Sequence, residues 1–275
     1  MIVTALIVGI RVTVIANQQS TENRQRAQRP HKIIKLPKEA DTQDIVSLGE
    51  KIHPKTGKKV KGIAIIYRIS PLQTAKPTAT INNSLCYGYY AQGVKWKTIE
   101  PWVFDPDNNQ GLDPNTLFNI ENKDILKWED AADGKTGNRK YVDILGNGSI
   151  TSIPASIDLL SPDGINEAYF GDIQTPGVVA VTVVWGVFDG PINDRQIVEW
   201  DRVFNDVQFL WSTKGDPTKI DFENISTHEF GHSVGLIDIY DSTCYQQTMY
   251  GYVSFGQTIK RTLENGDING INLLY

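Results

Sequence analysis

The stretch HEFGHSVGLID, residues 228–238, decides how this sequence is interpreted. It places His228 and His232 four residues apart, and a helix brings such positions to one face, one turn apart. Both imidazoles can therefore approach a single metal ion, as a zinc site requires. Glu229 then lies beside the metal position, where it can accept a proton from water without being a ligand.

A catalytic zinc site usually has three protein ligands and one open position, so a third ligand is needed. The other two histidines, His31 and His53, lie in a polar stretch upstream. Asp238 is the favoured third ligand, because Gly235 permits a left-handed turn that returns the chain towards the metal. Three further candidates stay open: Asp241, Glu264 on the predicted last helix, and Cys244.

Length and composition limit the class of protein. At 275 residues the chain is long enough for one large domain or one domain with an extension, given about 100–200 residues per domain. With 40% hydrophobic and 21% charged residues it is typical of a soluble globular protein. A net charge of -5 gives no reason to expect nucleic acid or an anionic membrane as a partner.

The chain divides into three predicted segments. Residues 1–16 are apolar apart from Arg11 and two threonines, which indicates an export signal or a retained membrane anchor. Residues 17–83 are polar over most of their length, contain one strand-like run at 61–70, and are interpreted as a pro-segment or a permanent N-terminal extension. The catalytic domain is predicted to span residues 84–275.

Within residues 84–275 the pattern predicts alternating strands and helices. Helices are expected at 113–132, at 216–235 and at 261–275, the first with Asp113 as its N-cap and the second ending at Gly235. Strands are expected over four runs: 96–106, 166–173, 177–188 and 195–205.

HEFGHSVGLID together with TMYGY at 248–252 resembles the metzincin metalloproteases, and within them the matrixin-like group. The resemblance covers residues 84–275. It implies an α/β (α+β) fold of the zincin type, with a twisted mixed sheet, a long N-terminal helix, an active-site helix and a C-terminal helix. Carried over residue by residue, it implies zinc ligands His228, His232 and Asp238, general base Glu229, turn residue Gly235, and Met249 beneath the metal.

This sequence departs from the matrixin pattern at two positions. Asp238 stands where matrixins usually have a third histidine, although a minority of these enzymes use aspartate. Gly251 stands where some metzincins have a tyrosine that stabilises the oxyanion, so Tyr250 and Tyr252 are interpreted as packing or substrate-cleft residues.

The resemblance implies a secreted zinc endopeptidase that acts on polypeptides, with no nucleic-acid partner and no membrane-spanning domain, and we expect a monomer. The alternative is a catalytically silent, zinc-stabilised module that binds peptides. The similar fold also implies that strand 178–185 could be the sheet edge on which an extended substrate pairs, which is compatible with its being a core strand.

The cysteines and acidic clusters leave further alternatives. In an exported protein Cys86 and Cys244 are expected to form a disulfide; otherwise Cys86 caps the zinc of a latent precursor, or both are free thiols. Calcium is a possible second cofactor at residues 104–113 and 214–221, although ordinary turn chemistry is the preferred explanation of both.

Overall fold

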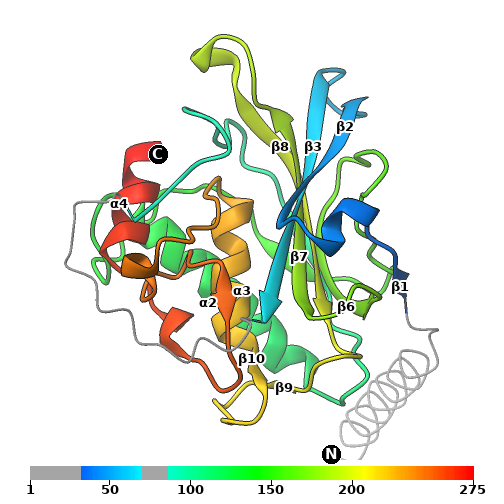
Figure 1. Cartoon of the computed structure of the whole chain (residues 1–275). Coiled ribbons are helices and arrows are strands. Elements are labelled where there is room, and N and C mark those ends of the chain that lie inside the picture. Colours follow the sequence, from blue (N-terminus) through cyan, green and yellow to red (C-terminus); the bar gives the residue numbers. More distant parts are fainter. Residues whose placement is uncertain (1–31, 70–85) are drawn as a thin grey trace, which may run out of the picture. The chain divides into compact units, whose positions relative to one another are not determined.

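The computed structural model describes residues 32–69 and 86–275 (Figure 1). Ile33–Tyr275 forms one compact unit. The predicted export signal, residues 1–16, lies outside the described residues, as do residues 17–31 and 70–83 of the predicted extension. In the part of the chain that is described, no helix is both long enough and apolar enough to cross a membrane.

A twisted mixed sheet forms the centre of the unit. Nine strands of the described residues join in it, seven of them in the order β11-β3-β7-β8-β6-β4-β5, with β2 beside β3 and β1 beside β6. A separate parallel pair is formed by β9 and β10. The strands of both sheets are β1 (Ile33–Ile34), β2 (Ile45–Ile52), β3 (Lys59–Ile69), β4 (Trp102–Asp105), β5 (Gly148–Ile150), β6 (Asn166–Ile173), β7 (Val178–Val187), β8 (Gln196–Asn205), β9 (Trp211–Ser212), β10 (Ile220–Asp221) and β11 (Tyr252–Val253).

Three α-helices of the described residues lie on one side of this sheet (Figure 1): α2 (Pro114–Ala131), α3 (Phe222–Ser233) and α4 (Asn265–Leu274). The predicted cap of α2 is confirmed, because the Asp113 side chain accepts a hydrogen bond from the Thr116 backbone N–H. Four short 3-10 turns occupy connections, at Lys38–Asp41, Ile192–Asp194, Ser242–Cys244 and Ile259–Arg261. The predicted α+β class, with its mixed sheet and helices, is therefore confirmed.

The sheet carries an apolar core on each face. The helix side contains large aromatic residues, including Trp102, Trp128, Trp200 and Phe230. The opposite face is covered by residues 34–48 and by residues 155–159, which pack over β7 and β8. Because both faces are covered, β7 is buried along nearly all its length, as its continuous run of valines predicts.

In the described structure strand 178–185 is not a sheet edge, because β3 of the predicted N-terminal extension covers it. β7 pairs antiparallel with β3 from Val178 to Gly186 and antiparallel with β8 from Ala180 to Val187. β7 is therefore a core strand here, and whether it becomes an edge without the extension stays a prediction.

The compact unit starts much earlier than the predicted domain boundary at residue 84. β3 alternates buried side chains between the two cores, with Ala64 and Ile66 on one face and Ile65 and Tyr67 on the other. At Gly62 a β-carbon would lie 2.6 Å from the Trp185 ring, so glycine allows close packing of β3 on β7. Residues 33–69 thus belong to the same sheet as residues 86–275, and their removal or retention stays a prediction.

Several element boundaries differ from the sequence expectation. The strand expected over 96–106 is limited to β4, at its C-terminal end. The helix expected from residue 216 begins at Phe222, because Asp221 caps it by accepting from the Asn224 N–H. The last helix begins at Asn265 rather than 261, since Ile259–Arg261 forms a separate turn.

Candidate metal centre

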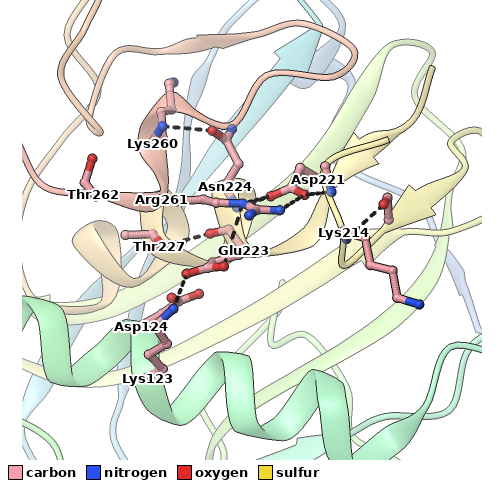
Figure 2. Close-up of polar contacts among 12 residues, drawn as sticks. Lys123, Asp124, Lys214, Asp221, Glu223, Asn224, Thr227, Lys260, Arg261 and Thr262 are labelled. Atoms are coloured by element: carbon pink, nitrogen blue, oxygen red, sulfur yellow. Dashed lines mark hydrogen bonds and ion pairs between the residues drawn. The ribbon is translucent and has the colours of Figure 1, made fainter. Parts of the chain in front are cut away.

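The first turn of α3 is tied to the segment that precedes α4. The Arg261 guanidinium donates to both carboxylate oxygens of Asp221, at 2.8 Å and 2.5 Å, and the Lys260 backbone N–H donates to the Asn224 side chain at 2.9 Å (Figure 2). Charge-assisted, two-point contacts of this kind fix orientation as well as position. They hold in place the helix that carries both histidines.

The two histidines of α3 lie on one face, as their spacing predicts. Their rings are 4.9 Å apart between centroids and nearly perpendicular, at 89°. His228 and His232 are both fully buried. Their Nε2 atoms lie 3.1 Å and 3.5 Å from the same oxygen, Oδ1 of Asp238. The structure therefore brings together these three sequence-predicted residues.

A backbone carbonyl determines the tautomer of each ring. Nδ1 of His228 lies 2.6 Å from the Thr248 carbonyl oxygen, and Nδ1 of His232 lies 3.0 Å from that of Leu236. A carbonyl oxygen only accepts, so each Nδ1 carries the proton and donates it. Each Nε2 then presents a lone pair, which is the state that binds a metal.

The turn after α3 delivers Asp238. Gly235 has φ +117°, a conformation that favours glycine, and the Leu236 N–H donates back to the Gly231 carbonyl at 2.9 Å. Asp238 follows, and its Oδ1 lies next to the Nε2 atoms of both histidines. Its Oδ2 accepts from the Tyr240 hydroxyl at 3.3 Å. Asp241 instead caps the next 3-10 turn by accepting from the Thr243 N–H and hydroxyl.

These atoms fit a zinc ion. Nε2 of both histidines, Oδ1 of Asp238 and Oε1 of Glu229 are buried and have no hydrogen-bond partner among the described residues. Ligands about 2.0 Å from a tetrahedral ion lie about 3.3 Å apart, close to the measured 3.1 Å and 3.5 Å. Leaving such atoms unpaired is costly, and a bound cation would remove that cost.

Two other candidates for the third ligand do not join this group. Glu264 lies at the N-cap of α4, and Cys244 is bonded to Cys86 in a disulfide. The expected disulfide is therefore present, and the alternative of Cys86 as a zinc-capping thiolate is wrong. Its sulfur is already bonded to another sulfur and cannot be a thiolate.

Glu229 is fully buried with one oxygen fixed and one unpaired. Its Oε2 accepts from the Thr182 hydroxyl of β7 at 2.5 Å, while Oε1 has no partner among the described residues. Burial raises the pKa of Glu229 to about 7. Burial also lowers the pKa of His228 to about 4, which keeps that imidazole neutral. A carboxyl group of this kind can both accept and release a proton near neutral pH.

Met249 lies beneath α3, fully buried. A β-carbon at Gly231 would overlap the Met249 sulfur and would lie 2.8 Å from the Trp128 ring, so the glycine makes this close approach possible. The backbone N–H groups of Met249 and Thr248 donate to the buried Asp267 carboxyl of α4. Thr248 in turn supplies the carbonyl that holds His228, so this turn positions a histidine directly.

Tyr67 of β3 was not found by sequence reasoning. Its ring stacks on His228 with centroids 3.8 Å apart and 14° between planes. The buried Lys260 ammonium donates to the Tyr67 hydroxyl and to the carbonyls of Tyr250 and Tyr252. Strand periodicity predicts only that Tyr67 is buried, and nothing in the pattern places it against a histidine 161 positions later.

The two acidic stretches with possible calcium ligands, 104–113 and 214–221, are used in local structure. Asp113, which ends the stretch 104–113, caps α2. In 214–221, Asp216 accepts from Thr218, and Asp221 caps α3 while pairing with Arg261. These contacts agree with the preferred explanation by turn and cap chemistry.

Residues 191–275 match the family model Peptidase_M10, described as matrixin. The match contains α3, the turn to Asp238, Met249 and α4. This part of the chain is therefore similar to the metzincin-type peptidases, and within them to the matrixins. The matrixin family is zinc-dependent in general and generally extracellular. Among the curated proteins no match was found.

Proposed function

We propose that this chain is a zinc-dependent endopeptidase in which His228, His232 and Asp238 hold the metal and Glu229 is the general base. The observation that carries the proposal is the convergence of buried atoms without partners: two imidazole nitrogens and one carboxylate oxygen, beside a free oxygen of Glu229. When bound there, a zinc ion supplies a Lewis acid that polarises the peptide carbonyl and acidifies water.

In this proposal Glu229 moves the proton. Thr182 holds Oε2, so Oε1 is the atom that takes a proton from the attacking water. The pKa of about 7 allows the same carboxyl to release that proton to the leaving amine. The carbonyls of Thr248 and Leu236 keep both imidazoles oriented throughout.

The rival function is a zinc-stabilised module that binds peptides without cutting them. Glu229 argues against it, because a structural zinc site closes its fourth position and needs no adjacent base. Glu229→Gln distinguishes the two functions. Under the proposal, casein hydrolysis falls by at least about 10²-fold while zinc content is unchanged.

The matched control is Asp143→Asn, an exposed carboxylate between α2 and β5, for which we expect wild-type activity. A wild-type protein that binds zinc and leaves casein intact would instead support the binding module. Undiminished hydrolysis by Glu229→Gln would remove Glu229 from the mechanism.

In this structure the candidate site is closed to a substrate. The histidines and Glu229 are fully buried in this form, and Tyr67 stacks on His228. We propose that this is a closed form, in which β3 covers the site, and that the extension over residues 17–83 is a pro-segment. Because β3 is part of the sheet, its displacement must expose the edge of β7.

N-terminal sequencing during a time course of casein hydrolysis tests this step. If residues 33–69 are a pro-segment, activity rises only as the new N-terminus moves beyond residue 69. Full activity in chains that keep Ile33 through the time course would assign the segment to the mature enzyme.

Export is supported by two observations. A disulfide joins Cys86 to Cys244, and such bonds persist mainly in oxidising compartments. The matched family is generally extracellular. We therefore propose secretion, with residues 1–16 as signal or anchor, a polypeptide substrate and a monomeric enzyme. Mass spectrometry of the culture medium and of the membrane fraction identifies which of the two contains the chain.

A further inference from the structure

The end of strand β3 fills a slot in the sheet beside the candidate metal centre. It pairs antiparallel with β7 on one side and parallel with β11 on the other, where Tyr252 lies opposite Arg68. β3 belongs to the extension that we propose is a pro-segment. Its departure would leave a gap one strand wide, with unpaired main-chain groups on β7 and on β11. An extended peptide can pair with both edges of such a gap.

Tyr67 is the residue of β3 that reaches into the site from this slot. It is fully buried, and its ring stacks on His228 with centroids 3.8 Å apart. Its two neighbours point to the other face of the sheet, where Ile66 joins the opposite core and Nε of Arg68 donates to Asp44 at 3.0 Å. Of these three residues, Tyr67 alone therefore occupies the pocket next to the zinc ligands.

Lys260 closes the far end of this pocket. It is fully buried in the turn Ile259–Arg261. Its Nζ donates to the carbonyls of Tyr250 and Tyr252 and to the Tyr67 hydroxyl. Both carbonyls lie in the segment that follows Met249, so they stay with Lys260 when β3 leaves. Of the three N–H groups of the ammonium, two thus keep their partners and the third depends on the hydroxyl.

A phenol hydroxyl suits either protonation state of Lys260. Burial lowers the pKa of Lys260 to about 7, so both states are populated near neutral pH. The two carbonyls only accept, and they use two N–H groups in either state. The remaining position is an N–H in the ammonium and a lone pair in the amine, and a hydroxyl pairs with both. A phenylalanine ring would fill the same space and leave this buried position unpaired, which costs free energy.

We propose that the pocket filled by Tyr67 is the specificity pocket of the enzyme, and that it selects a tyrosine beside the cleaved bond of an extended polypeptide. Lys260 is then the specificity-determining residue, and β3 takes the place of the substrate in the closed form. The inference rests on the proposed peptidase function and on the departure of β3. It adds the side chain that the site selects and the group that selects it.

The test starts from the full chain with one zinc bound, incubated until casein hydrolysis reaches its final rate. Two synthetic peptides are compared: KGIAIIYRI, which copies residues 61–69, and its twin with phenylalanine in place of the tyrosine. We expect kcat/KM to be at least about 10-fold higher for the tyrosine peptide. Product masses should place the tyrosine next to the cut. Dissociation constants, measured by fluorescence anisotropy, give a readout that does not require cleavage.

Lys260→Met tests the selecting group. Methionine keeps an unbranched side chain but has no N–H group, so the ratio between the two peptides should fall to about 1 with zinc content unchanged. The matched control is Lys214→Met, at an exposed lysine, which should keep the wild-type ratio. Lys260→Met also removes the partner of two carbonyls, so the peptide pair on the wild-type enzyme decides the inference if this variant does not fold.

The outcomes separate this inference from the proposed function. Casein hydrolysis with equal kcat/KM for the two peptides overturns the specificity pocket and leaves the peptidase standing. If neither casein nor peptide is cleaved, the peptidase proposal fails, and an at least about 10-fold tighter dissociation constant for the tyrosine peptide still supports the pocket. Equal dissociation constants in that case overturn the pocket as well.

Discussion

Two groups of titratable side chains occupy opposite faces of one sheet. The candidate zinc centre lies on the helix side and combines two imidazoles with one carboxylate, whereas the group on the other face consists of the carboxyl groups of Asp158, Asp163 and Glu199. In the first, each Nδ1 has a carbonyl partner and His228 stays neutral. In the second, burial raises the pKa of Glu199 to about 9 because the charged form is disfavoured.

The difference indicates how each group is accommodated in the fold. The imidazoles are oriented by backbone carbonyls for a metal that does chemistry, so loss of the ion should chiefly cost activity. At Glu199 burial disfavours the charged form, so replacing this carboxyl group should leave activity unchanged. Substitutions and chelators separate these two consequences.

The largest effect is expected for His232→Ala. Removing one of three zinc ligands should abolish stoichiometric zinc binding and reduce peptide hydrolysis to background, as measured by metal analysis and a casein assay. Glu199→Gln, from the other cluster, should keep both zinc and activity. Retained zinc and activity in His232→Ala would remove this residue from the centre.

Chelation should test the metal dependence of the processed wild-type enzyme. A zinc chelator such as 1,10-phenanthroline should abolish casein hydrolysis, and added zinc should restore it. Hydrolysis and zinc content are measured on the same samples. If hydrolysis survives after the zinc has been removed, the centre is not required for activity.

Asp238→Ala and Asp241→Ala test the third ligand. Asp238→Ala should weaken zinc affinity by at least about 10-fold, even if water takes its place. Asp241→Ala should keep zinc affinity and lose only a cap, worth about 1 kcal/mol of stability. Zinc affinity measured by competition decides between them, and the reverse order of affinities would make Asp241 the ligand.

The smallest effect is expected at the contact between Gly231 and Met249, beside the candidate zinc centre. Gly231→Ala should destabilise the fold by about 1–3 kcal/mol, because its methyl group would overlap Met249. Met249→Leu, which nearly conserves volume, should cost less than about 1.5 kcal/mol. Chemical denaturation measures both, and a harmless Gly231→Ala would show that Met249 has room to move.

Much of the helix side could be predicted from the sequence. The spacing of His228 and His232, the cap at Asp113 and the valine run of β7 are local patterns with one structural consequence each. The glycine at position 235 likewise marks the end of α3, since its φ of +117° is costly for other residues.

The rest depends on contacts between distant segments, which no local pattern contains. Tyr67 reaches His228 only because β3 pairs with β7. The polar composition of residues 17–60 hides a strand pair, since β2 and β3 bury alternate side chains only once the sheet has formed. Asp158, Asp163 and Glu199 are separated by up to 41 positions and form no motif.

The most direct test of the central claim is zinc titration of the chelator-treated, N-terminally processed enzyme, with casein hydrolysis followed at each step. We predict no hydrolysis without metal and full recovery at one zinc per chain. Hydrolysis that survives complete removal of zinc, or zinc bound at one per chain without any hydrolysis in an N-terminally processed enzyme, would contradict it.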